Sequence, residues 1–141
     1  MFNTLLLAID INDPEGAVRN TQAAVETAKH LKAKLHVLTV VPDDGMAIVS
    51  ASLSADHAEA AMETAKMALR AWAGATIPDG IDTELHVARG KIYDRILKVA
   101  NDLRVDGIYV GAHSPDLRDY LLGSNAARVA RHATQSVFVI R

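Results

Sequence analysis

Residues 4–41 read TLLLAIDINDPEGAVRNTQAAVETAKHLKAKLHVLTVV, and this stretch decides the fold. It opens with one continuous apolar run, Thr4–Ile9, and closes with another, Leu35–Val41. Short runs of this kind are typical of strands that are buried on both faces of a parallel sheet. Between them, small and apolar residues recur at helical spacing up to Leu31. We therefore predict a strand–helix–strand unit, with Asp13 as the N-cap of the helix and Pro14 at its first position.

The same alternation continues to the end of the sequence. The further elements that the pattern predicts are a long helix capped by Ser54, a strand over Asp82–Ala88, a helix over Ile92–Leu103, a strand over Gly107–Gly111, a helix that starts at Gly123-Ser124 and a strand over Gln135–Ile140. Strands that alternate with helices imply right-handed crossovers and a parallel sheet covered on both faces. We expect one three-layer α/β domain over residues 1–141.

The composition limits the classes of function. The 141 residues are 50% hydrophobic and 23% charged, an ordinary globular mixture. A net charge of −2 and an aromatic content of 4% argue against a nucleic-acid-binding surface. The sequence has no cysteine, which excludes disulfides, thiol catalysis and thiolate metal sites. The first apolar run is too short for a signal peptide or a membrane span, so we expect a cytoplasmic protein with no membrane contact.

The common nucleotide and metal motifs are missing. The first predicted strand is followed by DINDPEG rather than G-x-G-x-x-G, and Gly90-Lys91 does not complete a Walker A loop. The six histidines lack zinc spacing, so the sequence predicts neither a metal site nor a catalytic residue. Ligands of such sheets bind beyond the carboxyl ends of the strands, where the winding reverses. Asp10 and His113 follow two predicted strands there, although Asp10 taken alone is better explained as a turn or capping residue.

Gly123-Ser124 stands before an alanine-rich helical pattern that has no acidic residue in its first turn. One explanation is that Ser124 is an ordinary helix cap. The other is that the N–H groups of Asn125 and Ala126, the helix dipole and the serine hydroxyl bind a phosphate. Ala127 stands where a capping box would carry Glu or Gln, which favours the phosphate.

The segment DGIYVGAHSPDLRDYLLGSNAARVARHATQSVFVIR, Asp106–Arg141, resembles the C-terminal signature of the universal stress proteins. The likeness extends over the chain through TLLLAIDI, LHVLTVVPD and GKIYDRIL, and LLGSNAA is similar to an ATP-binding branch of that family. The family's motif is G, two residues, G, nine residues, then G with Ser or Thr. Gly111 and Gly123-Ser124 match its ends. Ser114 replaces the second glycine, and eight residues rather than nine separate it from Gly123.

The resemblance implies a three-layer α/β sandwich of the adenine nucleotide alpha hydrolase-like type, with four helices and a parallel five-stranded sheet of order 3-2-1-4-5. It implies ATP as the ligand. Whether Asp116 or Asp119 holds a magnesium ion beside the ATP is left open. Asp10 would hold the ribose hydroxyls. Ala8 and Ile9 would line the adenine pocket, and the backbone of Val40 would contact the adenine edge. The residues that would contact the ribose and the phosphates are Gly111, His113, Ser114, Gly123, Ser124 and Asn125.

Three functions remain open from the sequence. The first is an ATP-binding stress-response or signalling module without rapid chemistry, whose client proteins the sequence does not identify. The second is a slow ATPase in which His113 or a loop acid positions water. The third is a nucleotide-free interaction module. We also expect a homodimer, with a tetramer as a further option, because Ser136–Ile140 is an apolar edge strand that a second copy would cover.

Overall fold

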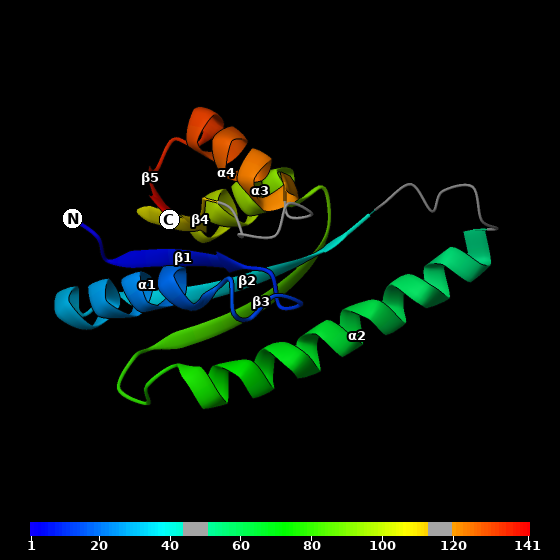
Figure 1. Ribbon diagram of the computed structural model, residues 1–141, viewed down its shortest axis with the longest axis horizontal. Coiled ribbons are helices and arrows are strands. Elements are labelled where there is room, and N and C mark those ends of the chain that lie inside the picture. Colours follow the sequence, from blue (N-terminus) through cyan, green and yellow to red (C-terminus); the bar gives the residue numbers. More distant parts are fainter. Residues whose placement is uncertain (44–50, 113–119) are drawn as a thin grey trace.

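The computed structural model describes residues 1–43, 51–112 and 120–141, without the side chains of residues 51–55 and 120–123. Its elements are β1 (Thr4–Ile9), α1 (Val18–Leu31), β2 (Lys34–Pro42), α2 (Ala51–Thr76), β3 (Thr83–Gly90), α3 (Ile92–Leu103), β4 (Gly107–Gly111), α4 (Tyr120–His132) and β5 (Ser136–Ile140). The five strands form one sheet of order β3-β2-β1-β4-β5, and neighbouring strands pair in parallel (Figure 1). The predicted fold class and strand order are therefore confirmed.

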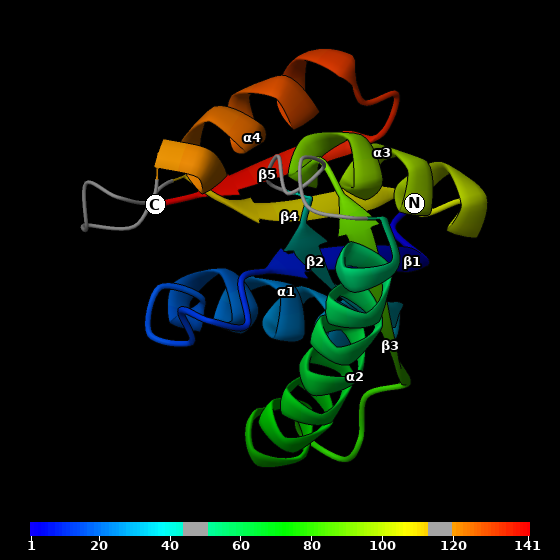
Figure 2. The ribbon, with the colours of Figure 1, turned by 90° about the vertical axis from the view of Figure 1, so that its right-hand side faces the viewer.

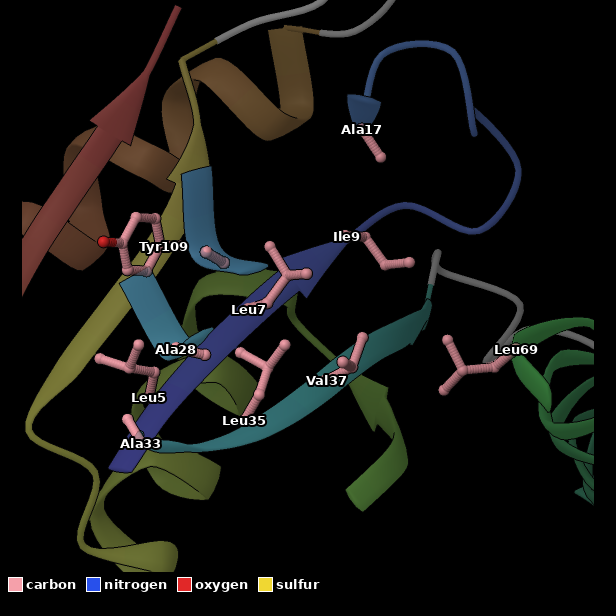
Figure 3. Packing of buried hydrophobic residues seen from close by; sticks show 11 residues of the cluster. Leu5, Leu7, Ile9, Ala17, Ala28, Ala33, Leu35, Val37, Leu69 and Tyr109 are labelled. Atoms are coloured by element: carbon pink, nitrogen blue, oxygen red, sulfur yellow. The ribbon is translucent and has the colours of Figure 1, made fainter. Parts of the chain in front are cut away.

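Helices cover both faces of the sheet. Figure 2 shows α1 and α2 on one side and α3 and α4 on the other. Because successive side chains of a strand point to opposite faces, β1 serves both cores. Leu5 and Leu7 are fully buried toward α1 (Figure 3), while Leu6 is fully buried toward α3 and α4. Each such leucine stabilises the fold by about 1.5–3 kcal/mol, so β1 anchors both layers.

Helix α1 starts later than the sequence predicted. Its N-cap is Ala17, which makes no side-chain capping bond, and its first residue is Val18. The Asp13 carboxylate accepts the N–H of Gly16 at 3.1 Å instead, and the N–H of Ala17 bonds to the C=O of Pro14. Asp13 thus caps a tight turn that precedes the helix. The prediction of Asp13 as the N-cap of the helix was therefore wrong, and so was the predicted start of the helix.

Two other helix starts also differ from the prediction, in the opposite direction. Helix α2 begins at Ala51, so Ser54 lies inside it rather than at its N-cap. Helix α4 begins at Tyr120, so Gly123 and Ser124 lie within the helix rather than before it. By contrast, β4 and α3 have the predicted bounds. On α2, Ala65 and Leu69 are buried, whereas Ala61 is exposed.

Candidate functional site

The carboxyl ends of β1 and β4 separate from one another. Paired residues of the two strands run from Leu5 with Gly107 to Leu7 with Tyr109, and no pairing follows although both strands continue. The side chain of Asn20, on the first turn of α1, occupies this point. Its Nδ2 donates to the C=O of Ala8 at 3.1 Å and to the C=O of Tyr109 at 3.5 Å. Asn20 was not predicted from the sequence, because a polar residue early in a helix is usually exposed.

Asp10 lies at the end of β1, beside this separation. Its side chain is half-buried, and its Oδ1 accepts the N–H of Asn12 at 2.9 Å. Its backbone C=O accepts the N–H of Asp13 at 3.0 Å. The turn-forming role that the sequence left open is therefore present. It fixes the carboxylate in place, and no hydrogen bond within the described part of the chain uses Oδ2.

The residues expected around an adenine base do not share one face of the sheet. Ala8 and Val40 pack on the side of α3 and α4. The Ile9 side chain belongs to the core cluster beneath α1, on the opposite face (Figure 3). Only the backbone of Ile9 can therefore face a ligand that contacts the side chains of Ala8 and Val40.

The predicted phosphate residues on α4 have different environments. Asn125 is buried, and its Oδ1 accepts the N–H of Tyr93 at 2.9 Å, which caps the first turn of α3. Ser124 is exposed and lines a hollow of about 260 Å³. Gly111 ends β4, where the N–H of Ala112 donates to the C=O of Ile140 at 2.7 Å. Two predicted residues, His113 and Ser114, lie outside the described residues.

The hollow at Ser124 has cationic walls. Lys91 and Arg128 line it, and the Arg128 guanidinium lies 5.0 Å from the centre of the Tyr93 ring. A neighbouring hollow of about 500 Å³ shares Ser124 and Arg128 and adds Arg131. The acidic side chain on the rim, Asp43, is paired with Arg89 at 3.2 Å. The excess of positive charge suits an anionic ligand.

A third hollow, of about 460 Å³, opens on the other face of the sheet, between α1 and α2. Apolar side chains such as Val25 and Trp72 make up much of its wall. None of the predicted site residues that the structure describes lines it. It is therefore separate from the strand ends and offers little to a phosphate.

A second polar group, which the sequence analysis missed, lies on β2 and β3. His36 Nδ1 is 2.8 Å from His86 Nε2 and 3.6 Å from Glu84 Oε2. Burial lowers the pKa of both imidazoles, and the proximity of His86 lowers the pKa of His36 further. The hydrogen bond and charge of Lys34, whose Nζ lies 3.1 Å from Glu84 Oε2, lower the pKa of the Glu84 carboxyl. A repeated tripeptide, Leu-His-Val at residues 35–37 and 85–87, was the available signal.

Comparison with known proteins gives a consistent result. The family model described as "Universal stress protein family" matches residues 1–141. The curated universal stress protein G of Salmonella typhimurium is 29% identical over 148 residues, which cover 100% of both chains. Over the described residues, no helix has the length and apolar character needed to cross a membrane.

Solved structures show the same fold. The universal stress protein UspA from Lactobacillus plantarum superposes with a TM-score of 0.75 at 26% identity, covering 99% of this chain and 98% of that one. The universal stress protein from Archaeoglobus fulgidus in complex with dAMP gives a TM-score of 0.61 at 20% identity, covering 99% of this chain and 98% of that one. At that identity the second likeness concerns the fold alone.

Proposed function

This chain belongs to the universal stress protein family, and from that premise we propose that it binds an adenine nucleotide, ATP, as a stress-response or signalling module. The observation that carries the proposal is the carboxylate of Asp10, fixed by its own turn beside the point where β1 and β4 separate. Ligands of open parallel sheets bind at such a point. The Oδ2 atom of Asp10 is the acceptor for a ribose hydroxyl.

The phosphates extend from there toward Ser124 in this proposal. Support comes from the hollows that Ser124 lines, where Lys91, Arg128 and Arg131 supply positive charge. A related family member bound to dAMP supports the adenine nucleotide class. These cationic side chains support a triphosphate rather than a monophosphate as the ligand.

Calorimetric titration of ATP tests the role of Asp10. Asp10→Asn retains an Oδ1 acceptor for the Asn12 N–H but loses the charge and one acceptor. Hydrogen bonds to charged groups contribute about 1.5–3 kcal/mol, so we expect ATP affinity to fall about 10-fold or more. Asp79→Asn, at an exposed position in a turn, is the matched control and should bind like the wild type. Equal ATP affinity in Asp10→Asn and Asp79→Asn would refute the placement, and a wild type that binds no ATP would refute the function.

The number of phosphates can be tested separately. Arg128→Gln removes one cationic side chain from both hollows while keeping a polar side chain of similar length. We expect it to weaken ATP binding more than AMP binding, because the added phosphates carry the additional negative charge. Equal losses for the two nucleotides would argue against a triphosphate site at Ser124.

We propose that the bound ATP undergoes no rapid reaction. The carboxylate beside the strand ends, Asp10, serves the ribose in this arrangement and lies far along the nucleotide from the γ-phosphate. A phosphate-release assay should give turnover well below ~1 s⁻¹, the low end of typical enzymes. Sustained turnover at that rate, lost in His113→Ala, would favour the ATPase alternative instead.

A further inference from the structure

The side chains of His36, Glu84 and His86 form a compact group between β2 and the edge strand β3. In the strand register His36 lies opposite Glu84, and Leu38 lies opposite His86. Because side chains alternate along a strand, all three residues point to the face of the sheet that Leu38 and α3 share. One donor atom from each residue can be chosen so that all three lie within 4.8 Å of one another.

We propose that His36, Glu84 and His86 bind a divalent transition-metal ion that joins β3 to β2. Two imidazoles and one carboxylate are the ligand types that Zn²⁺ and its neighbours in the first row prefer, whereas Mg²⁺ and Ca²⁺ prefer all-oxygen sites. Three protein ligands leave one tetrahedral position for water. This site is independent of the proposed nucleotide site.

The distances are close to those of a metal centre. Two zinc-bound nitrogens at tetrahedral angles lie about 3.3 Å apart, given Zn–N bonds of about 2.0–2.1 Å. The present separation of 2.8 Å between His36 Nδ1 and His86 Nε2 must therefore widen by about half an ångström. Glu84 is half-exposed and can turn toward the ion, while His36, only 4% exposed, holds a fixed position.

The protons of the two imidazoles can be accounted for when the ion binds. Both imidazoles have a lowered pKa, so they are neutral at neutral pH, which is the form that ligates metals. Their mutual hydrogen bond holds one proton between Nδ1 of His36 and Nε2 of His86. When the ion binds, that proton moves to the other nitrogen of the same ring. Each ring then donates one lone pair, and no redox change occurs.

Lys34 competes with the ion for the same carboxylate. Its Nζ lies 3.1 Å from Glu84 Oε2, and its side chain is exposed enough to swing into water. Removing the ammonium should leave the carboxylate available to the metal and remove a like charge. Removing the Lys34 ammonium should therefore increase the affinity for the ion, whereas a loss of structure would decrease it.

The test is a calorimetric titration of tag-free protein with Zn²⁺. We expect the wild type to bind one Zn²⁺ per chain. His86→Gln should lose at least about 10-fold in affinity, since the loss of even an indirect supporting contact costs that much. Lys34→Met should gain affinity for Zn²⁺. Glu84→Gln, at a half-exposed position, serves if His86→Gln does not fold. His30→Gln, at an exposed position on α1, is the control for nonspecific histidine binding.

The thermal midpoint gives a second measurement on the same proteins. An ion that binds only the folded chain raises the midpoint, so Zn²⁺ should stabilise the wild type and His30→Gln more than His86→Gln. Zinc affinity unchanged in both His86→Gln and Glu84→Gln, or reduced equally by His30→Gln, would overturn the proposal. An affinity that Lys34→Met lowers would also contradict it.

Discussion

His36 Nδ1 and His86 Nε2 lie 2.8 Å apart, although fifty positions separate the two residues in the sequence. The contact joins β2 to β3 on the face that α3 covers. His36 is buried, and His86 is partly buried. A charge on either ring would therefore have to be accommodated away from water and beside a second imidazole.

The stability of the fold should consequently decrease in mild acid. Burial lowers the pKa of both imidazoles from the ordinary value of 6.5, so below that pH the unfolded chain binds more protons than the folded chain. The free energy of unfolding is then unaffected by these groups above pH 6.5 and falls as the pH drops below it. Urea denaturation in the presence of a chelator, from about pH 7.5 to about pH 5.5, where histidine titrates, measures the effect.

His86→Gln is the diagnostic variant for this pH dependence, because it removes one of the two titrating rings. Its unfolding free energy should vary less between neutral and mildly acidic pH than that of the wild type. Glu84 does not produce the same effect. Because the pKa of its carboxyl is lowered from the ordinary value of 4.5, its contribution to the free energy of unfolding is lost only below that pH. A flat profile in the wild type, or an unchanged slope in His86→Gln, would contradict the assignment.

Asn20→Ala should destabilise the protein. The substitution removes the donor for the C=O groups of Ala8 and Tyr109, where β1 and β4 separate. A buried carbonyl left without a partner costs about 1–3 kcal/mol. Among the described residues the buried Asn20 Oδ1 has no hydrogen-bond partner, so deleting it offsets part of this cost. We expect the free energy of unfolding to fall by about 1 kcal/mol, the lower end of that range.

Chemical denaturation measures this loss, with Gln22→Ala as the matched control. Gln22 is exposed on the same helix, and surface substitutions usually change stability by less than about 0.5 kcal/mol. Equal stability of the two variants would mean that Asn20 does not hold the strand ends together.

Gly123→Val should weaken ATP binding. Gly123 directly precedes Ser124, which lines the cationic hollow, and a branched side chain there would intrude on the proposed path of the phosphates. Valine also has a helix propensity different from that of glycine, so a control is needed. Gly74→Val makes the same change in α2, where the added side chain meets open space. Calorimetry should show lower ATP affinity in Gly123→Val alone. Equal affinity in Gly123→Val and Gly74→Val would contradict the proposed placement of the phosphates beside Gly123.

The sheet was predictable because its strands carry the information locally. Continuous apolar runs such as Thr4–Ile9 are typical of strands covered on both faces, and the resemblance supplied their order. The start of α1 was not predictable, because it depends on which N–H the Asp13 carboxylate accepts. The Asp13 carboxylate takes the N–H of Gly16 in a turn, and no sequence pattern distinguishes that turn from a first helical turn.

The polar groups were harder to predict than the strands. The contact between His36 and His86 exists only because the register sets Leu38 opposite His86 and His36 opposite Glu84. A shift of one residue would turn one ring to the other face of the sheet. Asn20 was not indicated for a similar reason, since the C=O groups of Ala8 and Tyr109 come together beside it only in the folded sheet.

The edge strand β5 is the surface through which we expect two chains to form a homodimer. The Ile140 C=O accepts the N–H of Ala112 and so faces β4. Because the backbone groups of successive residues point to opposite edges of a strand, the N–H groups of Val137 and Val139 point away from β4. Val139 is 43% exposed, which is large for a valine in a strand. We propose that β5 of two chains pair antiparallel across this edge about a two-fold axis.

Val139→Pro should weaken that dimer without disturbing the pairing of β5 with β4, because it deletes an outward N–H only. The two-fold axis repeats the loss, so two hydrogen bonds of about 1 kcal/mol each should raise the dissociation constant about 30-fold. Val139→Thr keeps the N–H and the branched shape and is the control. Light scattering after size exclusion at micromolar concentration measures the mass of each protein. A monomeric wild type would exclude the dimer, and a Val139→Pro protein as dimeric as Val139→Thr would move the interface away from β5.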